Sequence, residues 1–266
     1  MVVSLALGGV VGTIMGLTGA GGGILAVPLL VFGLHLTVAQ AGPVALLAVG
    51  ISAALGALMG LNNHIVRYRA AMLTAATAIL MAPVGVWIAQ RLNTRVMGVL
   101  FAIVLAWVAY KTFNESRTQC VDAEPKGPAP PCLRDAETGR FVWTSPCAGV
   151  LSLSGGAAGF LSGLLGVGGG FVMVPALQRY TDLTTRSVVA TSLAVIALVS
   201  LAGVGSSVAA GQFNFTAALP FGAGGVVGMG AGFLLSSRLS KKNLQLSFAI
   251  ISAAVSIGMF LKSIDT

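Results

Sequence analysis

Two stretches of this chain carry the same dense pattern of glycines: GTIMGLTGAGGGILAVP at residues 12–28 and GFLSGLLGVGGGFVMVP at residues 159–175. Each holds three adjacent glycines inside an apolar run. The offset of 147 residues also pairs Arg91 with Arg238, and it continues without a gap over both halves of the chain. The sequence is therefore an internal duplication with an unrepeated connector.

The composition is that of a membrane protein. Only 8% of the 266 residues are charged and 56% are hydrophobic, whereas roughly 25% of residues are charged in an average soluble domain. Apolar stretches long enough to cross a bilayer recur in both halves, and they lack the alternation of a barrel strand. We therefore predict an all-α, polytopic membrane protein with about eight transmembrane segments, arranged as two homologous four-segment halves with broken first helices.

Duplication and hydropathy together divide the chain into three parts. We expect a first transmembrane repeat at residues 1–113, an extramembrane connector at 114–147 and a second transmembrane repeat at 148–266. The connector holds five of the seven acidic residues and the run PAPP at 128–131. Such a composition is typical of a solvent-exposed linker.

The basic residues point to a membrane topology rather than to nucleic acid. The formal charge is +8, and the short loops carry the basic residues as the positive-inside rule requires. If each half crosses four times, the loops with Arg91 and Arg238 share the cytoplasmic face, the halves are parallel, and both termini and the connector lie outside. If the first element of each half returns without crossing, the halves are inverted and the charge bias is weaker.

All three cysteines, Cys120, Cys132 and Cys147, lie in or beside the connector. We expect a disulfide if this face is oxidising, and the sequence does not decide which pair forms. Metal binding is less favoured, because there is no C-x-x-C pair and the histidines, His35 and His64, belong to other loops.

Glycines spaced four residues apart precede each triple-glycine cluster. This spacing places them along one helix face, where a second helix can approach closely. We therefore interpret these glycines as packing positions. They are Gly8, Gly12 and Gly16 in the first copy and Gly155, Gly159 and Gly163 in the second.

The triple glycines predict a break in the first helix of each half. A straight helix over residues 5–34 would span about 45 Å, against a hydrocarbon core of about 30 Å. The helix that restarts at Ile24 or Phe171 would direct free N–H groups and a partial positive charge into a polar cavity, which is an anion site without a charged side chain. The alternative is that all six glycines of the two clusters serve tight helix packing.

The candidate substrate-binding residues are the cluster glycines and three nearby or adjacent hydroxyls. Other hydroxyls in the spans, Ser200 among them, are more simply bonded to the preceding helical turn. The chosen residues are Thr18, Gly19, Gly21, Gly22, Gly23, Gly166, Gly168, Gly169, Gly170, Thr191 and Ser192.

None of the seven acidic residues lies inside an expected span. Coupling to protons or sodium through buried carboxylates is therefore disfavoured. An anion that leaves a cytoplasm at negative potential gains about 2.3 kcal/mol per charge per 100 mV, so export needs no such relay. The chain has no paired carboxylates, no H-E-x-x-H and no nucleophile with its base, so we expect no enzyme activity, no metal and no cofactor.

The doubled element has the form G-x-x-x-G-x-x-G-x-G-G-G-x-x-x-V-P and resembles the signature of the TauE/SafE sulfite-exporter family, also called TSUP. The resemblance covers both halves. It implies a polytopic transporter of the bacterial inner membrane that moves small sulfur-containing anions, sulfite or organosulfonates, usually outward. The partners it implies are a small anionic substrate and the lipid bilayer, and uptake of an organosulfur or other small oxyanion is the alternative. The family motif falls on the eight cluster glycines, and the connector has no counterpart in it.

Overall fold

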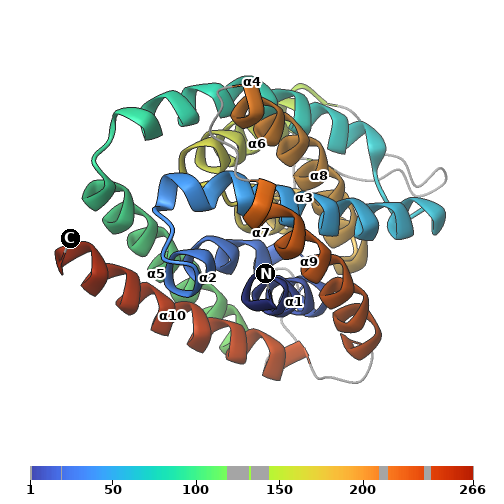
Figure 1. Ribbon diagram of the computed structural model, residues 1–266. Coiled ribbons are helices and arrows are strands. Elements are labelled where there is room, and N and C mark those ends of the chain that lie inside the picture. Colours follow the sequence, from blue (N-terminus) through green and yellow to red (C-terminus); the bar gives the residue numbers. More distant parts are fainter. Residues whose placement is uncertain are drawn as a thin grey trace.

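The computed structural model describes residues 2–18, 20–118, 132, 144–209, 215–236 and 241–265, and these are helical apart from loops and one isolated β-bridge. Figure 1 shows the helices packed into one bundle. The first half holds α1 (Val2–Thr18), the 3₁₀-helix η1 (Ala20–Leu25), α2 (Ala26–Gly33), α3 (Val38–Asn62), α4 (Tyr68–Arg91) and α5 (Thr94–Thr118). The second holds α6 (Ser145–Leu165), α7 (Gly170–Tyr180), α8 (Thr185–Ala209), α9 (Phe215–Ser236) and α10 (Lys241–Asp265).

The offset of the sequence repeat also relates the helices. Helices α8 and α10 begin and end 147 residues after α3 and α5. Helices α6, α7 and α9 follow α1, α2 and α4 with ends that differ by only a few residues. The repeated sequence therefore forms the same series of helices twice.

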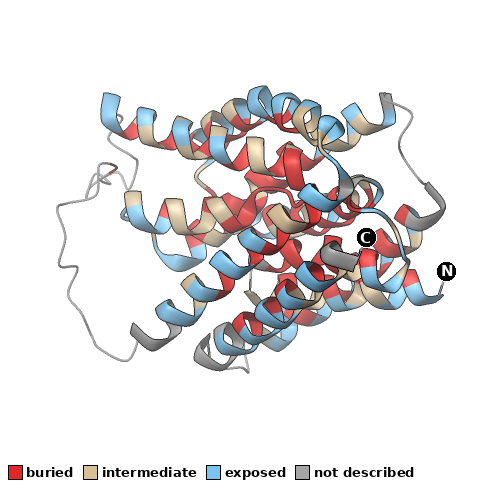
Figure 2. Cartoon of the chain, turned by 90° about the vertical axis from the view of Figure 1, so that its left-hand side faces the viewer, coloured by how far each residue is buried: buried red, intermediate tan, exposed pale blue. Residues whose placement is uncertain are grey.

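Within the described residues, six helices are long and apolar enough to cross a membrane. Large apolar side chains such as Leu153, Leu201 and Leu234 are exposed on the outside of the bundle, which suits a surface that lipid covers. Figure 2 shows buried residues gathered in the middle of the bundle and exposed ones on the outer helix faces. The six segments are Gln40–Asn62, Tyr68–Arg91, Arg95–Asn114, Ser145–Leu165, Thr185–Val208 and Ala218–Leu235.

The glycine stripes hold the first helix of each half against the other half. A Cβ added to Gly12 would overlap the backbone of Gly225 in α9, and one added to Gly159 would overlap the backbone of Ala78 in α4. These two contacts are equivalent under the 147-residue offset. The interpretation of the stripes as packing positions is confirmed, and the two halves interlock (Figure 1).

Helices α3 and α8 are equivalents that run antiparallel. Gly50 lies against Ser200, and Gly60, further along α3, lies against Ala190, which is earlier in α8. Two helices related by a pseudo-two-fold axis can be antiparallel only if that axis is perpendicular to them. The halves are therefore inverted relative to each other, not parallel.

The first element of the first half folds back on itself. A Cβ added to Gly33, at the end of α2, would meet the side chain of Leu7 near the start of α1. Helix α2 thus returns beside α1, as the second of the two sequence-based topologies requires.

The start of α1 and the end of α10 lie on the face opposite to the described ends of the connector, residues 114–118 and 144–147, so the expectation that the termini and the connector share a face is wrong. Lys262 Nζ, near the end of α10, donates to Val31 O at 3.0 Å, and Figure 2 shows both termini on one side of the molecule. Because the halves are inverted, α6 begins at the face opposite to the start of α1. We call the face at the start of α1 the terminal face and the face at the start of α6 the connector face.

The connector is fastened to the α6–α7 pair by a disulfide between Cys132 and Cys147. The N–H of Cys132 donates to Tyr180 O at 3.2 Å, and the N–H of Asp182 donates to Cys132 O at 3.3 Å. Cys132 therefore joins the start of α6 to the end of α7. The sequence did not decide which two of the three cysteines pair, and the structure pairs Cys132 with Cys147. Cys120 lies outside the described residues.

Candidate functional site

The second triple-glycine cluster unwinds the chain between α6 and α7. Gly166 ends α6 with φ +71°, and Gly168 and Gly169 follow with φ +77° and +67°. Side chains rarely tolerate this left-handed region, which is why glycine occupies it three times. Gly169 is the N-cap of α7, and no described side chain caps it. The N–H groups of Val172 and Met173 donate to Gly169 O, which leaves those of Gly170 and Phe171 without an acceptor in the helix at this buried end.

The triple glycines of the first cluster lie in a 3₁₀-helix rather than in an unwound segment. Gly22 and Gly23 lie in the 3₁₀-helix η1, which continues directly into α2 with Leu25 already in a helical conformation. The expected helix start at Ile24 is therefore wrong, because Ile24 lies inside η1 and the α-helix begins at Ala26. Gly21 also belongs to η1, and Gly19 lies outside the described residues.

The two breaks approach each other where α3 crosses α8. A Cβ added to Gly23 would lie 3.4 Å from Val167 O, the carbonyl between Gly166 and Gly168. Val49 of α3 lies against both breaks. Its Cγ1 would be 3.2 Å from a Cβ added to Gly23 and 3.3 Å from a Cβ added to Gly168. The cluster glycines of both halves thus meet near the centre of the fold.

Ser200 brings a polar side chain to this meeting point. Its side chain is 1% exposed, and its Oγ finds no hydrogen-bond partner among the described residues. A Cβ added to Gly168 would lie 3.5 Å from Ser200 Oγ. An unpaired buried hydroxyl costs about 1–3 kcal/mol, and Ser192 and Ser252 share this state, so Ser200 is distinguished by its place beside Gly168. The equivalent residue in the first half is Ala53.

The three hydroxyls chosen from the sequence lie elsewhere or are engaged. Thr18 Oγ1 donates to Ile14 O at 2.7 Å within α1. Thr191 Oγ1 accepts from the N–H of Arg67 at 3.2 Å, beside the α3–α4 loop. Ser192 is buried and its Oγ has no described partner. The residue of α8 that contacts Gly168 is Ile196, and Ser192 lies one helical turn, about 6 Å, before it.

Comparison of the two repeats places Ser200 among the candidates without singling it out. It lies two turns beyond Ser192 in α8, and the sequence alone places both hydroxyls in the same apolar span. A serine stands where the other copy has alanine at both positions, Ser192 opposite Ala45 and Ser200 opposite Ala53. The comparison of the repeats therefore includes Ser200 but does not choose between the two serines.

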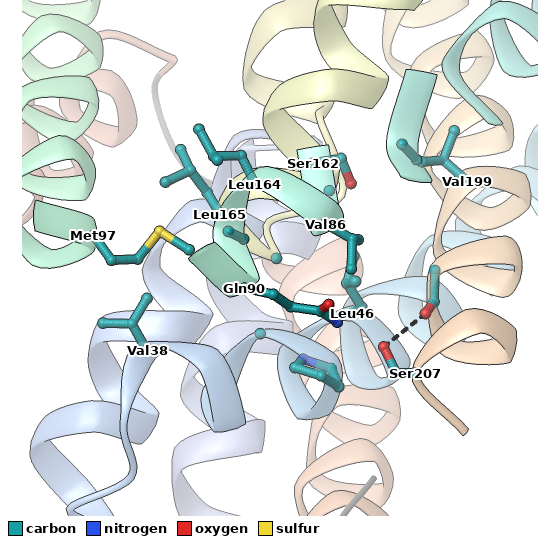
Figure 3. A pocket seen from close by; sticks show the side chains of 17 residues that line it. Val38, Leu46, Val86, Gln90, Met97, Ser162, Leu164, Leu165, Val199 and Ser207 are labelled. Atoms are coloured by element: carbon teal, nitrogen blue, oxygen red, sulfur yellow. Dashed lines mark hydrogen bonds between the residues drawn. The ribbon is translucent and has the colours of Figure 1, made fainter. Parts of the chain in front are cut away.

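A cavity of about 80 Å³ adjoins the second break from the terminal face. Gly166 and Ser162 line it from the end of α6, Val199 lines it from α8, and Leu46 lines it from α3. Figure 3 shows Gln90 of α4 reaching in among these side chains, with Ser207 hydrogen-bonded to its own helix. The cavity is mainly apolar with a few polar groups, as small-molecule sites commonly are.

Comparison with known proteins identifies the family. The model of the family described as "Sulfite exporter TauE/SafE" matches residues 4–259. The chain belongs to the TauE/SafE family. The resemblance seen in the glycine motifs is thereby confirmed, and this TauE/SafE protein is an integral membrane protein with several apolar helices.

Its relatives are named as transporters. A "Probable membrane transporter protein" of Xylella fastidiosa (strain Temecula1 / ATCC 700964) is 30% identical over 272 residues, which cover 99% of this chain and 96% of the relative. "Probable membrane transporter protein YunE" of Bacillus subtilis (strain 168) is 26% identical over 257 residues, 94% of this chain and 93% of the relative. No solved structure gives a significant match. The chain is thus a TauE/SafE membrane transporter, a description that agrees with the expectation of no enzyme activity.

Proposed function

We propose that this TauE/SafE protein exports a small sulfur-containing anion, sulfite or an organosulfonate, across the bacterial inner membrane. The observation that carries the proposal is the unpaired Oγ of Ser200 beside the uncapped start of α7. The anion would sit at the second break, with the first break closing the site from the other half.

The chemistry of the site suits a small oxyanion. A helix start carries roughly half a positive charge and free N–H donors, and α7 is long enough, at 11 residues, to have a dipole. Ser200 adds one O–H donor to the same place. Hydrogen bonds to a charged acceptor contribute about 1.5–3 kcal/mol each, so selectivity would rest on donors rather than on a basic side chain.

The architecture that we propose for this transporter is a pair of inverted halves, residues 1–113 and 148–266, with the connector 114–147 outside the bilayer. Counting each returning pair, α1–α2 and α6–α7, as one segment gives the eight segments expected from the sequence. In each half the first segment enters and returns, and the next three helices cross. Such a fold places irregular backbone at membrane depth only where protein surrounds it.

Outward transport is favoured by the lack of carboxylates in the expected spans. Export of an anion is driven by the membrane potential, whereas accumulation against it needs a coupling ion. Flux of sulfite from proteoliposomes should therefore increase when the compartment that holds the anion is made negative. Flux that ignores an imposed potential, or that needs a sodium or proton gradient, would favour uptake of an organosulfur or other small oxyanion.

Two observations bear on which face is cytoplasmic, and they disagree. The disulfide favours an oxidising compartment at the connector face. The positive-inside rule favours the opposite, because more basic loop residues lie at the connector face than at the terminal face. Labelling a single cysteine added after Thr266 with a reagent that cannot cross the membrane separates them. The basic positions are Arg67, Arg69, Arg179, Arg186, Lys241 and Lys242 at the connector face and Arg91, Arg95 and Lys262 at the terminal face.

Direct binding of sulfite and sulfoacetate to the purified protein tests the site. We expect S200A to weaken sulfite binding by about tenfold, the value of one charge-assisted hydrogen bond. The matched control is S252A, because Ser252 of α10 is also fully buried with an Oγ that has no described partner. Equal affinities in S200A and in the unmodified protein would overturn the assignment of the site.

A further inference from the structure

The cavity beside the second break has an equivalent place beside the first break that, among the described residues, buried methionine side chains fill. The open cavity lies toward the terminal face, between the start of α3 and the end of α8. Its equivalent under the 147-residue offset lies toward the connector face, between the end of α3 and the start of α8. The two places would be the two access routes to one central site.

Two methionines occupy the filled place. Ser162 and Ala82 line the open cavity, and their equivalents are Met15 and Met229. Met15 is fully buried and Met229 is 5% exposed, and both belong to the main buried apolar cluster. Longer side chains thus replace short ones at the two equivalent positions.

The surroundings of two equivalent glycines, Gly56 and Gly203, show that the methionine side chain fills space on one side only. A Cβ added to Gly56, on the filled side, would lie 2.7 Å from Leu193 Cδ1 and 2.9 Å from Met229 Cε. A Cβ added to Gly203, on the open side, would have only Leu46 Cδ1, at 3.0 Å, within 4 Å among the described residues. The methionine side chain therefore takes up the space that alanine leaves open.

We propose that Met15 and Met229 form a gate that closes the connector-face route, and that the structure is the conformation open to the terminal face. This inference rests on the proposed transport function. An apolar constriction excludes water and so blocks an anion without a charged barrier. Methionine is unbranched and can repack when helices move, so the same side chains can clear the route in the opposite conformation.

The gate predicts how two equivalent positions react with a charged thiol reagent. Ser52 is the equivalent of Val199, which lines the open cavity. In purified protein carrying C120S, we expect V199C to react and S52C to be protected. Replacing the gate by the residues of the other half, M15S with M229A, should raise the labelling rate of S52C by about tenfold and leave that of V199C unchanged.

Controls keep the test decisive. The variant M259A removes another buried methionine, 2% exposed in α10, and should leave S52C protected. The single variant M229L refills the space and should also keep S52C protected. If S52C stays protected in M15S with M229A while V199C still reacts, the gate is wrong. If the double variant no longer labels at V199C, the single variant M229A should raise the labelling rate of S52C. If M229A does not raise it, the gate is also wrong. Labelling needs no solute, so these outcomes are separate from sulfite binding to the unmodified protein, which tests the proposed function.

Discussion

The two triple-glycine clusters have nearly the same sequence and different structures. In the first half the glycines lie in a 3₁₀-helix that runs straight into α2. In the second half Gly166, Gly168 and Gly169 adopt left-handed conformations. Neither α2 nor α7 has a side-chain cap, but α7 is not preceded by a 3₁₀-helix as α2 is. Only the second break has a buried unpaired hydroxyl beside it, within the described residues. The duplication therefore specifies where each half breaks, and the surrounding residues decide which break offers hydrogen-bond donors.

The largest effect should be the same in both halves, because the glycine stripes are equivalent. We expect G12V and G159V each to prevent folding, since any Cβ there overlaps the backbone of a neighbouring helix, and overpacking against rigid backbone costs about 3 kcal/mol or more. Size-exclusion chromatography in detergent measures the folded yield.

The matched controls are G9A and G156A. Their nearest atoms from other elements would lie 3.9 Å and 3.5 Å from the added Cβ, which is ordinary contact distance. Normal yields are expected for both controls. If G12V folds while G159V does not, the halves are not held together by equivalent contacts.

The next effect should be confined to the second half, because only α6–α7 is tied by a disulfide. The bond closes a loop of 15 residues, which in the chain-entropy model contributes about 3 kcal/mol. We expect C147S to lower the thermal unfolding midpoint and C120S, which leaves this bond in place, to have no effect. Equal midpoints for C147S and the unmodified protein would show that the connector adds no stability to this pair.

Alanine substitutions test whether the backbone conformation differs between the two breaks, because alanine adds only a Cβ. At Gly23 and Gly168 an added Cβ has similar room, with nearest atoms at 3.2 Å in both cases. Gly168 alone of the two has a positive φ, so G168A adds about 1–2 kcal/mol of backbone strain. We expect G168A to weaken sulfite binding and G23A to leave binding and stability nearly unchanged. Identical behaviour of the two variants would remove the structural distinction between the breaks.

The smallest effect should come from giving the first half the hydroxyl it lacks. We expect A53S to lower stability by about 1 kcal/mol, because the hydroxyl has no evident partner, and to leave sulfite affinity unchanged. Titration with sulfite measures this. Tighter binding would mean that the first break also holds the anion, contrary to the comparison above.

The sequence predicted the features that depend on local spacing. Glycines four residues apart had to face another helix, as Gly12 and Gly159 do. The triple glycines had to interrupt a segment too long for one span. Both predictions rest on helix geometry, which does not change with the surroundings.

The orientation of the halves and the hydroxyl that we propose to bind the anion could not be predicted in the same way. The parallel arrangement followed from four crossings per half, and that count depends on whether α2 returns beside α1, a contact between Gly33 and Leu7 that the sequence does not reveal. Thr191 looked suitable because two hydroxyls are adjacent there, but its oxygen accepts from the backbone of Arg67. Only packing shows that Ser200, two turns later, faces the break.

The interlocking of the halves has a consequence for how the chain is made. Helix α1 is synthesised well before α9, yet its glycine face packs against α9. That face therefore lacks its folded-state partner until α9 has been made. The contact between α1 and α9 and its equivalent between α6 and α4 are the reciprocal contacts of a two-fold dimer. The protein is thus a dimer of antiparallel copies written into one polypeptide, in which covalent linkage supplies equal amounts of two subunits and fixes their opposite insertion.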